Sequence, residues 1–375
     1  MGKSTFELTI RGGDTPECPF VPKIWVDLAA NIMQIPYSSV INDSCAAMKV
    51  VVEAGLATGV DAVRLFFFPE RVVELRGGQY AHMSDGHLLG NIDIQGGWAT
   101  KLSDEGYFDF RNPEHVLNAH IFSHPHPIIN TESDALRLRI PEVAEIDALY
   151  GRSVEESIAL AGDELYCIGD CGSGTLAFCV SFMGMNQTML NIIDSPELLH
   201  TCMAIGTEIS IRRAAFFLAK GINILRLNDS VANMSVISPS CWRDLVKPHF
   251  MRFCSAVHSL DYDAKIYCHI CGNITPIVED LVECGFDCIA PLDTLSGLSI
   301  REIRSKVPKE TVLMGGINPL SFVTSTPAEI CSEAYECIRQ GRHGGGFILG
   351  SGCVVPRSAR RENIEAVVKA CREPW

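Results

Sequence analysis

Short apolar runs alternate along this chain with longer stretches in which apolar residues recur at helical spacing. Near-continuous apolar runs are typical of strands that are buried on both faces of a parallel sheet. Eight such runs stand out, at residues 21–27, 62–68, 165–170, 222–228, 264–269, 288–292, 312–316 and 347–350. Strands that alternate with helices predict an α/β fold, and eight of them predict a (β/α)8 (TIM) barrel.

Three helices between the later strands share one start signal. A hydroxyl residue is followed directly by proline at Ser195, Ser238 and Thr326. A hydroxyl N-cap with proline at the first helical position is typical of a helix start. We expect the first of these helices to run to Lys220, because the glycine at 221 is a typical stop signal.

The stretch at about 70–162 interrupts this alternation after the second strand. Its turn signals include Asp85-Gly86 and Gly96-Gly97, and Asp-Gly is a preferred dipeptide of tight hairpin turns. We therefore predict a single barrel domain over residues 1–375 with a β-hairpin and loop excursion inserted in it. Later in this stretch, the histidine- and proline-rich residues 120–127 are expected to form an extended surface connector, with a second metal site as the alternative.

Polar side chains gather at the ends of the predicted strands. The residues at or just after these carboxyl ends are Asp27, Asp170, Asp229, His269, Asp293 and Cys353. In a (β/α)8 barrel the carboxyl ends of the strands form the face that carries the chemistry. A doubly wound sheet would place only a few such residues at one crevice, so the ring of polar positions favours the barrel.

One histidine and two cysteines have the composition of an open zinc site. His269 and Cys271 are two residues apart in the run KIYCHICG, and Cys353 follows in FILGSGCVVP. Residues i and i+2 of an extended segment point the same way, so His269 and Cys271 can reach one ion. A catalytic zinc takes three protein ligands and keeps a fourth position open.

Two other interpretations of these cysteines stay open from the residues alone. A buried free cysteine is often a small apolar filler. Cys268 and Cys271 also have the spacing of a redox pair, although a redox CxxC usually opens a helix, and this one ends a strand-like run.

Composition and charge limit the classes of partner that the protein can bind and indicate its compartment. The net charge of −14 argues against nucleic acid and anionic membranes, which both require clustered cations. No apolar run in the sequence approaches the roughly 18 residues that span a bilayer, and the start has no hydrophobic signal core, so we predict a cytoplasmic protein. Sixteen cysteines in such a compartment imply reduced thiols and fit a cell with anaerobic metabolism.

The chain resembles the uroporphyrinogen decarboxylase superfamily, and most closely its zinc-dependent, corrinoid-linked methyltransferase branch. Besides the two cysteine motifs, the resemblance rests on residues 195–198 (SPEL), 228–230 (NDS), 237–239 (ISP), 315–319 (GGINP), Pro356 and 362–364 (ENI). It runs from about Pro19 to Cys371 and is strongest after Asp194. The arginine-rich start by which the decarboxylases grip porphyrin carboxylates is absent, since residues 22–27 read PKIWVD.

The resemblance implies a zinc site and names its ligands. His269, Cys271 and Cys353 would bind Zn2+, and Asp293 is a candidate fourth ligand in the resting state. An equally open role for Asp293 is a hydrogen-bonding carboxylate at the barrel mouth. Asp229 and Asp170 are candidates for proton handling or for support of the zinc-bound histidine.

The resemblance also implies methyl transfer. We expect the methyl group of a methoxylated aromatic substrate to pass to the Co(I) corrinoid (cobalamin) of a separate protein, as in an O-demethylase. The alternative is transfer from methylcobalamin to a thiol such as coenzyme M. Decarboxylation of a smaller acid and metal binding without turnover are further alternatives, and the sequence leaves a homodimer open.

The sequence does not encode a corrinoid-binding module. Residues 85–90 match D-x-H-x-x-G, by which such modules present histidine to cobalt, but no S-x-L element follows. The Asp-Gly step also favours a turn here. The corrinoid is therefore expected to arrive on a partner protein or as free cofactor.

Overall fold

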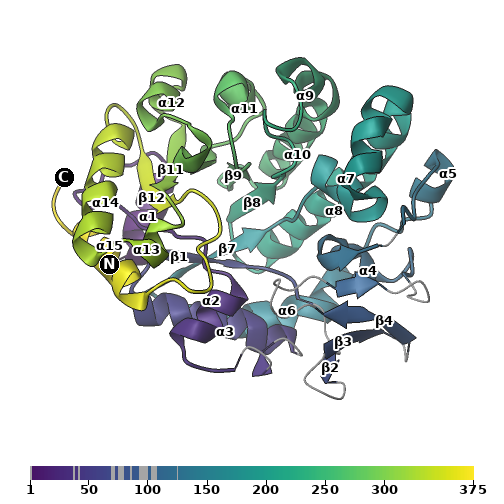
Figure 1. Ribbon diagram of the computed structural model, residues 1–375, viewed down its shortest axis with the longest axis horizontal. Coiled ribbons are helices and arrows are strands. Elements are labelled where there is room, and N and C mark those ends of the chain that lie inside the picture. The colour runs from purple at the N-terminus through teal and green to yellow at the C-terminus, as the bar shows by residue number, and fades with distance from the viewer. Residues whose placement is uncertain are drawn as a thin grey trace.

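Seven parallel strands form the main sheet of the protein (Figure 1). The computed structural model describes residues 2–36, 39–40, 43–68, 72–74, 80–84, 87–92, 100–102, 108–124 and 126–375. The strands, in sheet order, are β1 (Ala62–Leu65), β7 (Tyr166–Asp170), β8 (Ile224–Asn228), β9 (Lys265–His269), β10 (Cys288–Leu292), β11 (Val312–Ile317) and β12 (Phe347–Ser351). Each of them lies within a predicted strand or extends it by one residue.

An extended segment at residues 19–23 fills the eighth position and closes the barrel. Phe20 and Lys23 form parallel bridges to Leu349 and Val354 beyond one edge of the sheet. On the other side, the Asp61 amide donates to the Phe20 carbonyl at 3.0 Å. The predicted strand at 21–27 is therefore wrong in its second half, because α2 (Val26–Ile32) begins there. Proline at 22 lacks the N–H that a longer ladder would need.

Helices surround the sheet as the (β/α)8 prediction requires, and that prediction is confirmed (Figure 1). The helices of the ring and its connections are α3 (Ser44–Thr58), α6 (Val143–Ala161), α7 (Leu176–Asp194), α8 (Pro196–Ala219), α9 (Pro239–Leu245), α10 (Lys247–Leu260), α11 (Val278–Glu283), α12 (Ile300–Lys306), α13 (Ser321–Thr324), α14 (Pro327–Gly341) and α15 (Arg361–Cys371), with short 3-10 turns at Thr275–Ile277 and Thr294–Ser296. The Ser238 and Thr326 side chains cap α9 and α14 as predicted. The side chain of Ser195 does not cap α8.

The amino-terminal helix α1 (Gly2–Ile10) packs across one end of the barrel and closes it. Its buried Phe6 and Ile10 pack with inward-facing residues of the strands, among them Ala62, Tyr166 and Ile224 at or near the strand starts. This apolar cluster fills the barrel interior below its carboxyl-terminal mouth. The chemistry is thereby restricted to the upper layer of inward-facing side chains.

A second, smaller sheet occupies the first part of the 70–162 stretch (Figure 1). It consists of β2 (Val72–Glu74), β3 (Tyr80–Ser84), β4 (His87–Ile92), β5 (Thr100–Leu102) and β6 (Phe122–Ser123), and α4 (Pro113–Leu117), a turn at Ala119–Ile121 and α5 (Glu132–Ala135) accompany it. Ser84 pairs with His87 in an antiparallel ladder, which confirms the predicted hairpin. The turn residues 85–86 between them, and the glycines at 96–97, lie outside the described residues.

Helix α7 differs from the expectation that no apolar run reaches membrane-spanning length. Among the residues that the structure describes, α7 alone is long and apolar enough for a span, judged by length and composition. Non-helical backbone at Gly184 (φ 72°) divides it into two shorter helices. Phe178, Phe182 and Met183 of its first half are buried in the core, so length and composition alone are weak evidence for a span.

Candidate active site at the carboxyl-terminal mouth

Alternation along the strands builds a polar layer above the apolar one. Successive strand residues point to opposite faces, so a side chain two positions after an inward apolar residue also points inward. The pairs are Val21 and Lys23, Ala62 and Arg64, Ile168 and Asp170, Ile224 and Arg226, and Tyr267 and His269. In each pair the second residue is polar and less than 10% exposed. The mouth of the barrel is therefore a buried, strongly charged site.

His269, Cys271 and Cys353 lie together at this mouth, as the sequence predicts. The Cys271 sulfur lies 3.1 Å from that of Cys353 and 3.3 Å from His269 Nε2. His269 ends β9, and Cys353 follows β12 on the far side of β10 and β11. Gly272 (φ 91°) turns the chain directly after Cys271, a backbone conformation that favours glycine. Because Cys268 is wholly buried elsewhere in the core, the redox-pair interpretation has no support.

The two thiols differ in acidity, because one donates a hydrogen bond to the other. The hydrogen bond between them lowers the pKa of Cys353 to about 6 and raises that of Cys271. A thiolate next to a thiol is stabilised by the donated hydrogen bond, whereas a second thiolate at this separation is opposed by like charge. Cys353 is therefore the thiol that ionises first, and a thiolate is the form that binds metal.

Lys23 completes this cluster and was not predicted. Its Nζ lies 3.2 Å from His269 Nε2, and its side chain is buried. Burial, together with the nearby Arg226 and Arg64 cations, lowers the pKa of Lys23 to about 7. Burial and the same cations also hold the pKa of His269 well below its usual range, so the imidazole is neutral. A neutral imidazole is the form that binds metal.

The donor types fit a thiophilic divalent ion, although their spacing is tighter than in a metal complex. Ligand atoms in a tetrahedral zinc site lie about 3.6–3.8 Å apart. The observed contacts of 3.1 and 3.3 Å must therefore open by about half an ångström. Among the described residues no three His, Cys, Asp or Glu side chains already have the arrangement of a metal site. His269 Nδ1 is buried without a hydrogen-bond partner, so no second-layer acceptor orients the ring.

A pocket of about 130 Å3 adjoins this cluster and shares Lys23 with it. Trp25 and Phe66 form part of its wall, with ring centroids 4.3 Å apart in an edge-to-face contact. Arg213 and Arg226 line another part, together with Asp170. This volume is close to that of a cavity of about 150 Å3 that binds benzene, so the pocket has the size scale of a single ring.

Asp170 and Arg226 form a buried ion pair in the wall of this pocket. Burial alone would raise the pKa of Asp170, but the Arg226 charge and a hydrogen bond from the Gly172 amide at 2.9 Å bring it below its usual range. Asp170 is therefore an anion that holds Arg226 in place. Its predicted part in proton handling stays a prediction.

Asp229 lies beneath the mouth and is fully buried. Its carboxylate accepts hydrogen bonds from the Thr175 hydroxyl and from the amides of Ala177, Val231 and Ala232. It thus ties the start of α7 to the loop after β8. These hydrogen bonds are those of a residue that positions the backbone around it. They do not test the predicted catalytic role of Asp229, which stays a prediction.

Asp293 lies beside the thiols and is held by the backbone. Its Oδ2 accepts from the Gly272 amide at 3.0 Å, directly after Cys271. A β-carbon added to Gly352 would stand 3.3 Å from Asp293 Oδ1, which places the other oxygen against the residue before Cys353. Asp293 therefore lies next to both cysteine-bearing loops and is bonded to that of Cys271, and its use as a fourth metal ligand stays a prediction.

The histidines of 120–126 do not converge on one point. His120 lines the pocket, His124 packs against the rings of Phe108 and Phe182, and His126 is exposed. These different surroundings favour the connector interpretation over a second metal site, but His120 adds an imidazole to the pocket. The proline-rich pattern gave no sign of that role.

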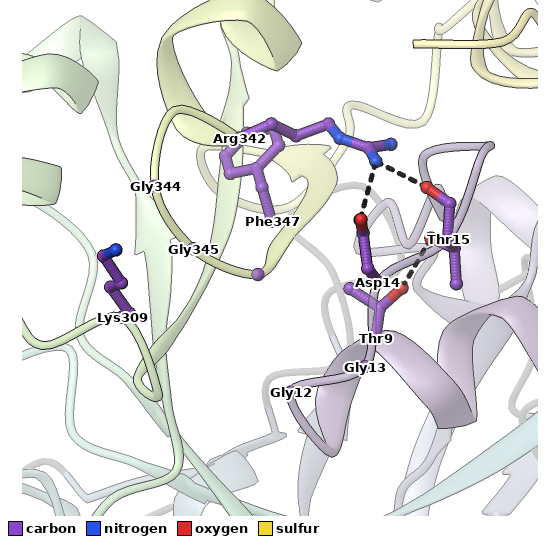
Figure 2. Close-up of a pocket in the computed structure, with 11 residues that line it drawn as sticks. Thr9, Gly12, Gly13, Asp14, Thr15, Lys309, Arg342, Gly344, Gly345 and Phe347 are labelled. Atoms are coloured by element: carbon purple, nitrogen blue, oxygen red, sulfur yellow. Dashed lines mark hydrogen bonds and ion pairs between the residues drawn. The ribbon is translucent and has the colours of Figure 1, made fainter.

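Two larger cavities lie away from the mouth. One, of about 340 Å3, is at the opposite end of the barrel, where β12 begins, and Figure 2 shows it. Its Arg342 is directed at Asp14 and the Thr15 carbonyl, so the cation is already satisfied (Figure 2). The other, of about 420 Å3, lies between α12 and α14 outside the barrel. Neither cavity adjoins the thiols.

Comparison with known proteins identifies related methyltransferases and the family of the chain. The methylcobamide:CoM methyltransferase MtaA of Methanosarcina barkeri is 25% identical over 235 residues, which are 62% of this chain and 64% of that protein. A methylated-thiol–coenzyme M methyltransferase of Methanosarcina mazei is 26% identical over 179 residues, 48% of this chain and 45% of that protein. The chain thus spans less than two thirds of the length of these curated relatives.

A solved structure shares the whole architecture. A methyltransferase from Methanosarcina mazei superposes with a TM-score of 0.71 at 20% identity, over 99% of this chain and 98% of that one. These matches confirm the resemblance to the corrinoid-linked methyltransferase branch. The uroporphyrinogen decarboxylase (URO-D) family matches residues 122–374, about two thirds of the sequence. The chain therefore belongs to the uroporphyrinogen decarboxylase family.

Proposed function

We propose that this protein is a corrinoid-dependent methyltransferase that takes the methyl group from a methoxylated aromatic compound. The corrinoid that receives the methyl group is carried by a separate protein. One observation carries the proposal: the thiol–imidazole cluster of His269, Cys271 and Cys353 adjoins a small pocket with an aromatic wall. The substrate ring then lies against Trp25 and Phe66, with its methoxy group directed at the cluster.

His269, Cys271 and Cys353 are the residues that would hold a zinc ion. Bound there, zinc supplies a Lewis acid for the ether oxygen of the substrate. The chain contributes the donor atoms in their metal-binding forms, since His269 is neutral and Cys353 ionises readily. Asp293 fixes the loop of Cys271 through the Gly272 amide and lies close to Gly352, the residue before Cys353.

Lys23 is placed to manage the proton of the reaction. When the methyl carbon–oxygen bond breaks, the phenolate oxygen keeps the electron pair and needs a proton. An amine with a pKa near 7 is divided between both protonation states at neutral pH and can give that proton from Nζ. Its place between the cluster and the pocket brings Nζ close to the departing oxygen.

Thiol methylation is the second candidate function. It is favoured by two relatives whose names state methyl transfer to coenzyme M, and the same cluster can bind a thiolate. Porphyrin decarboxylation is disfavoured, because residues 22–27 (PKIWVD) replace the arginine-rich start by which the decarboxylases grip porphyrin carboxylates. The direction of transfer separates the two candidates.

The test uses anaerobically purified protein, Co(I) cobalamin, and a panel of methoxyarenes and methylthiols. Absorbance at the methylcobalamin band reports transfer. The proposal expects methylcobalamin with a methoxyarene and none when the protein is omitted. Methylcobalamin formation from methylthiols alone would favour the second candidate, and its formation from no donor would contradict the first. Loss of the methylcobalamin band on addition of coenzyme M to methylcobalamin and the protein tests the second candidate directly.

A further inference from the structure

The pocket beside the thiols holds more positive than negative charge. Arg213, Arg226 and Lys23 line it, and among the described residues Asp170 is the one carboxylate in its lining. Arg64 lies nearby and is also buried, with hydrogen bonds to the Tyr267 hydroxyl and the Pro22 carbonyl. This excess contrasts with the net charge of −14 for the whole chain.

Arg213 shares the charge of Asp170 with Arg226 and, among the residues that the structure describes, forms no direct ion pair of its own. It is 5% exposed, donates to the Leu117 carbonyl, and places its guanidinium carbon 4.7 Å from the centre of the Phe67 ring. Within the described part of the chain, no carboxylate forms an ion pair with it. Burial of an unpaired charge is unfavourable, so this position is stabilised when a ligand supplies the anion.

Arg226 keeps one unsatisfied donor despite its ion pair. Its Nη1 binds Asp170 and its Nη2 donates to Asn228 at 2.8 Å, whereas its Nε is enclosed by the protein without a hydrogen-bond partner. The residue is 2% exposed. Arg226 therefore contributes its positive charge to the pocket wall, where an anionic ligand would stabilise it.

We infer that the small molecule bound in this pocket is an organic anion, with a carboxylate or sulfonate group held at Arg213 and Arg226. This inference rests on the proposed function and adds the chemical class of its substrate. The aromatic wall of Trp25 and Phe66 holds the ring, and the guanidinium groups hold its acidic end. The methyl-bearing end is then directed at Cys271 and Cys353, so the anion fixes the orientation for transfer.

The test compares two inert ligands of the same shape. Benzoate carries the anion, benzamide is its neutral isostere, and neither has a methyl group to transfer. Calorimetric titration of the full chain should show benzoate binding at least about ten-fold more tightly, since hydrogen bonds to charged groups are the stronger ones. Equal affinity for the two ligands, or no binding of either, would overturn the inference. This comparison needs no variant and so does not depend on the folding of a mutant.

A pair of neighbouring arginines supplies matched variants. Arg213→Met should abolish the preference for benzoate and leave benzamide binding within about two-fold. Arg212→Met, on the same helix but in a surface ion pair with Glu142, should keep the full preference. A preference retained in Arg213→Met would overturn the assignment to Arg213.

The test of the anion site can fail or succeed independently of the test of the proposed reaction. Anion-selective binding without methyl transfer to cobalamin would overturn the reaction and support the anion site. Methyl transfer that is equally fast from 4-methoxybenzoate and 4-methoxybenzamide would support the reaction and overturn the anion site. Preference for 3-mercaptopropionate over benzoate would assign the anion to a thiol substrate and not to an aromatic one.

Discussion

The Lys23 amine lies 3.2 Å from Nε2 of His269, although 246 residues separate them in the chain. The contact joins the segment that closes the barrel to the strand that carries the first metal-binding residue. It also connects the cluster with the pocket, because Lys23 lines both. The proposed proton donor thus lies between the predicted metal-binding residues and the wall of the pocket.

Replacement of Lys23 by methionine should slow methyl transfer from methoxyarenes by about 10²–10⁴-fold, the usual effect of losing a general acid. The loss should shrink for donors with a ring nitro group, because a stabilised phenolate can depart without a proton. The rates of methyl transfer from methoxyarenes with and without a nitro group, measured in both proteins, test this prediction. The exposed Lys49→Met is the control and should behave as wild type. An equal loss with both classes would contradict the proton-donor role.

Asp170→Asn should lower the free energy of unfolding by about 3–5 kcal/mol, since it leaves the Arg226 charge buried and unpaired. Urea denaturation measures this change. Asp147→Asn removes a partner of Lys220 at the surface and should cost at most about 1 kcal/mol. A similar decrease in the free energy of unfolding of both variants would show that the buried ion pair contributes no more stability than the surface pair.

The His200–His249 contact, 3.3 Å between ring nitrogens, should make stability depend on pH. Burial, helped by the neighbouring His200, lowers the pKa of His249 to about 4, whereas the unfolded residue titrates near about 6.5. The unfolded chain therefore binds more protons between these values. The contribution of neutral His249 to the free energy of unfolding should be complete above about pH 6.5. It should be lost as the pH falls towards 4.

His249→Gln should reduce this loss, which melting temperatures at pH 7 and pH 5 would show. The exposed His343→Gln should lose as much stability as wild type over the same interval. An unchanged loss in His249→Gln would assign the pH dependence to other groups.

Much of the fold, and the meeting of His269 with Cys271 and Cys353 at the mouth, could be predicted from the sequence. Parallel barrel strands are buried on both faces, so runs such as Cys288–Leu292 appear as continuous apolar segments. His269 and Cys271 were found because their two-residue spacing is a local property of the chain. Cys353 could be added because barrel strands all end at one face, which fixes where distant residues meet.

The charged wall of the pocket was missed for a physical reason. Arg64 and Arg226 each stand within an apolar strand, where they interrupt the pattern without ending it. A single arginine inside such a strand was the available signal, because a buried arginine requires a partner. Which partner it takes depends on the tertiary fold, as the pairing of Arg226 with Asp170 shows.

The most direct test of the central claim measures metal content and methyl transfer on the same anaerobic preparations of wild type and Cys353→Ala. Cys241→Ala, a partly exposed cysteine on α9, is the matched control. The account predicts about one zinc per chain and methylcobalamin formation in wild type and control. Cys353→Ala should lose both while its circular dichroism spectrum stays unchanged. Full methyl transfer by a folded Cys353→Ala protein without zinc would contradict the proposed site.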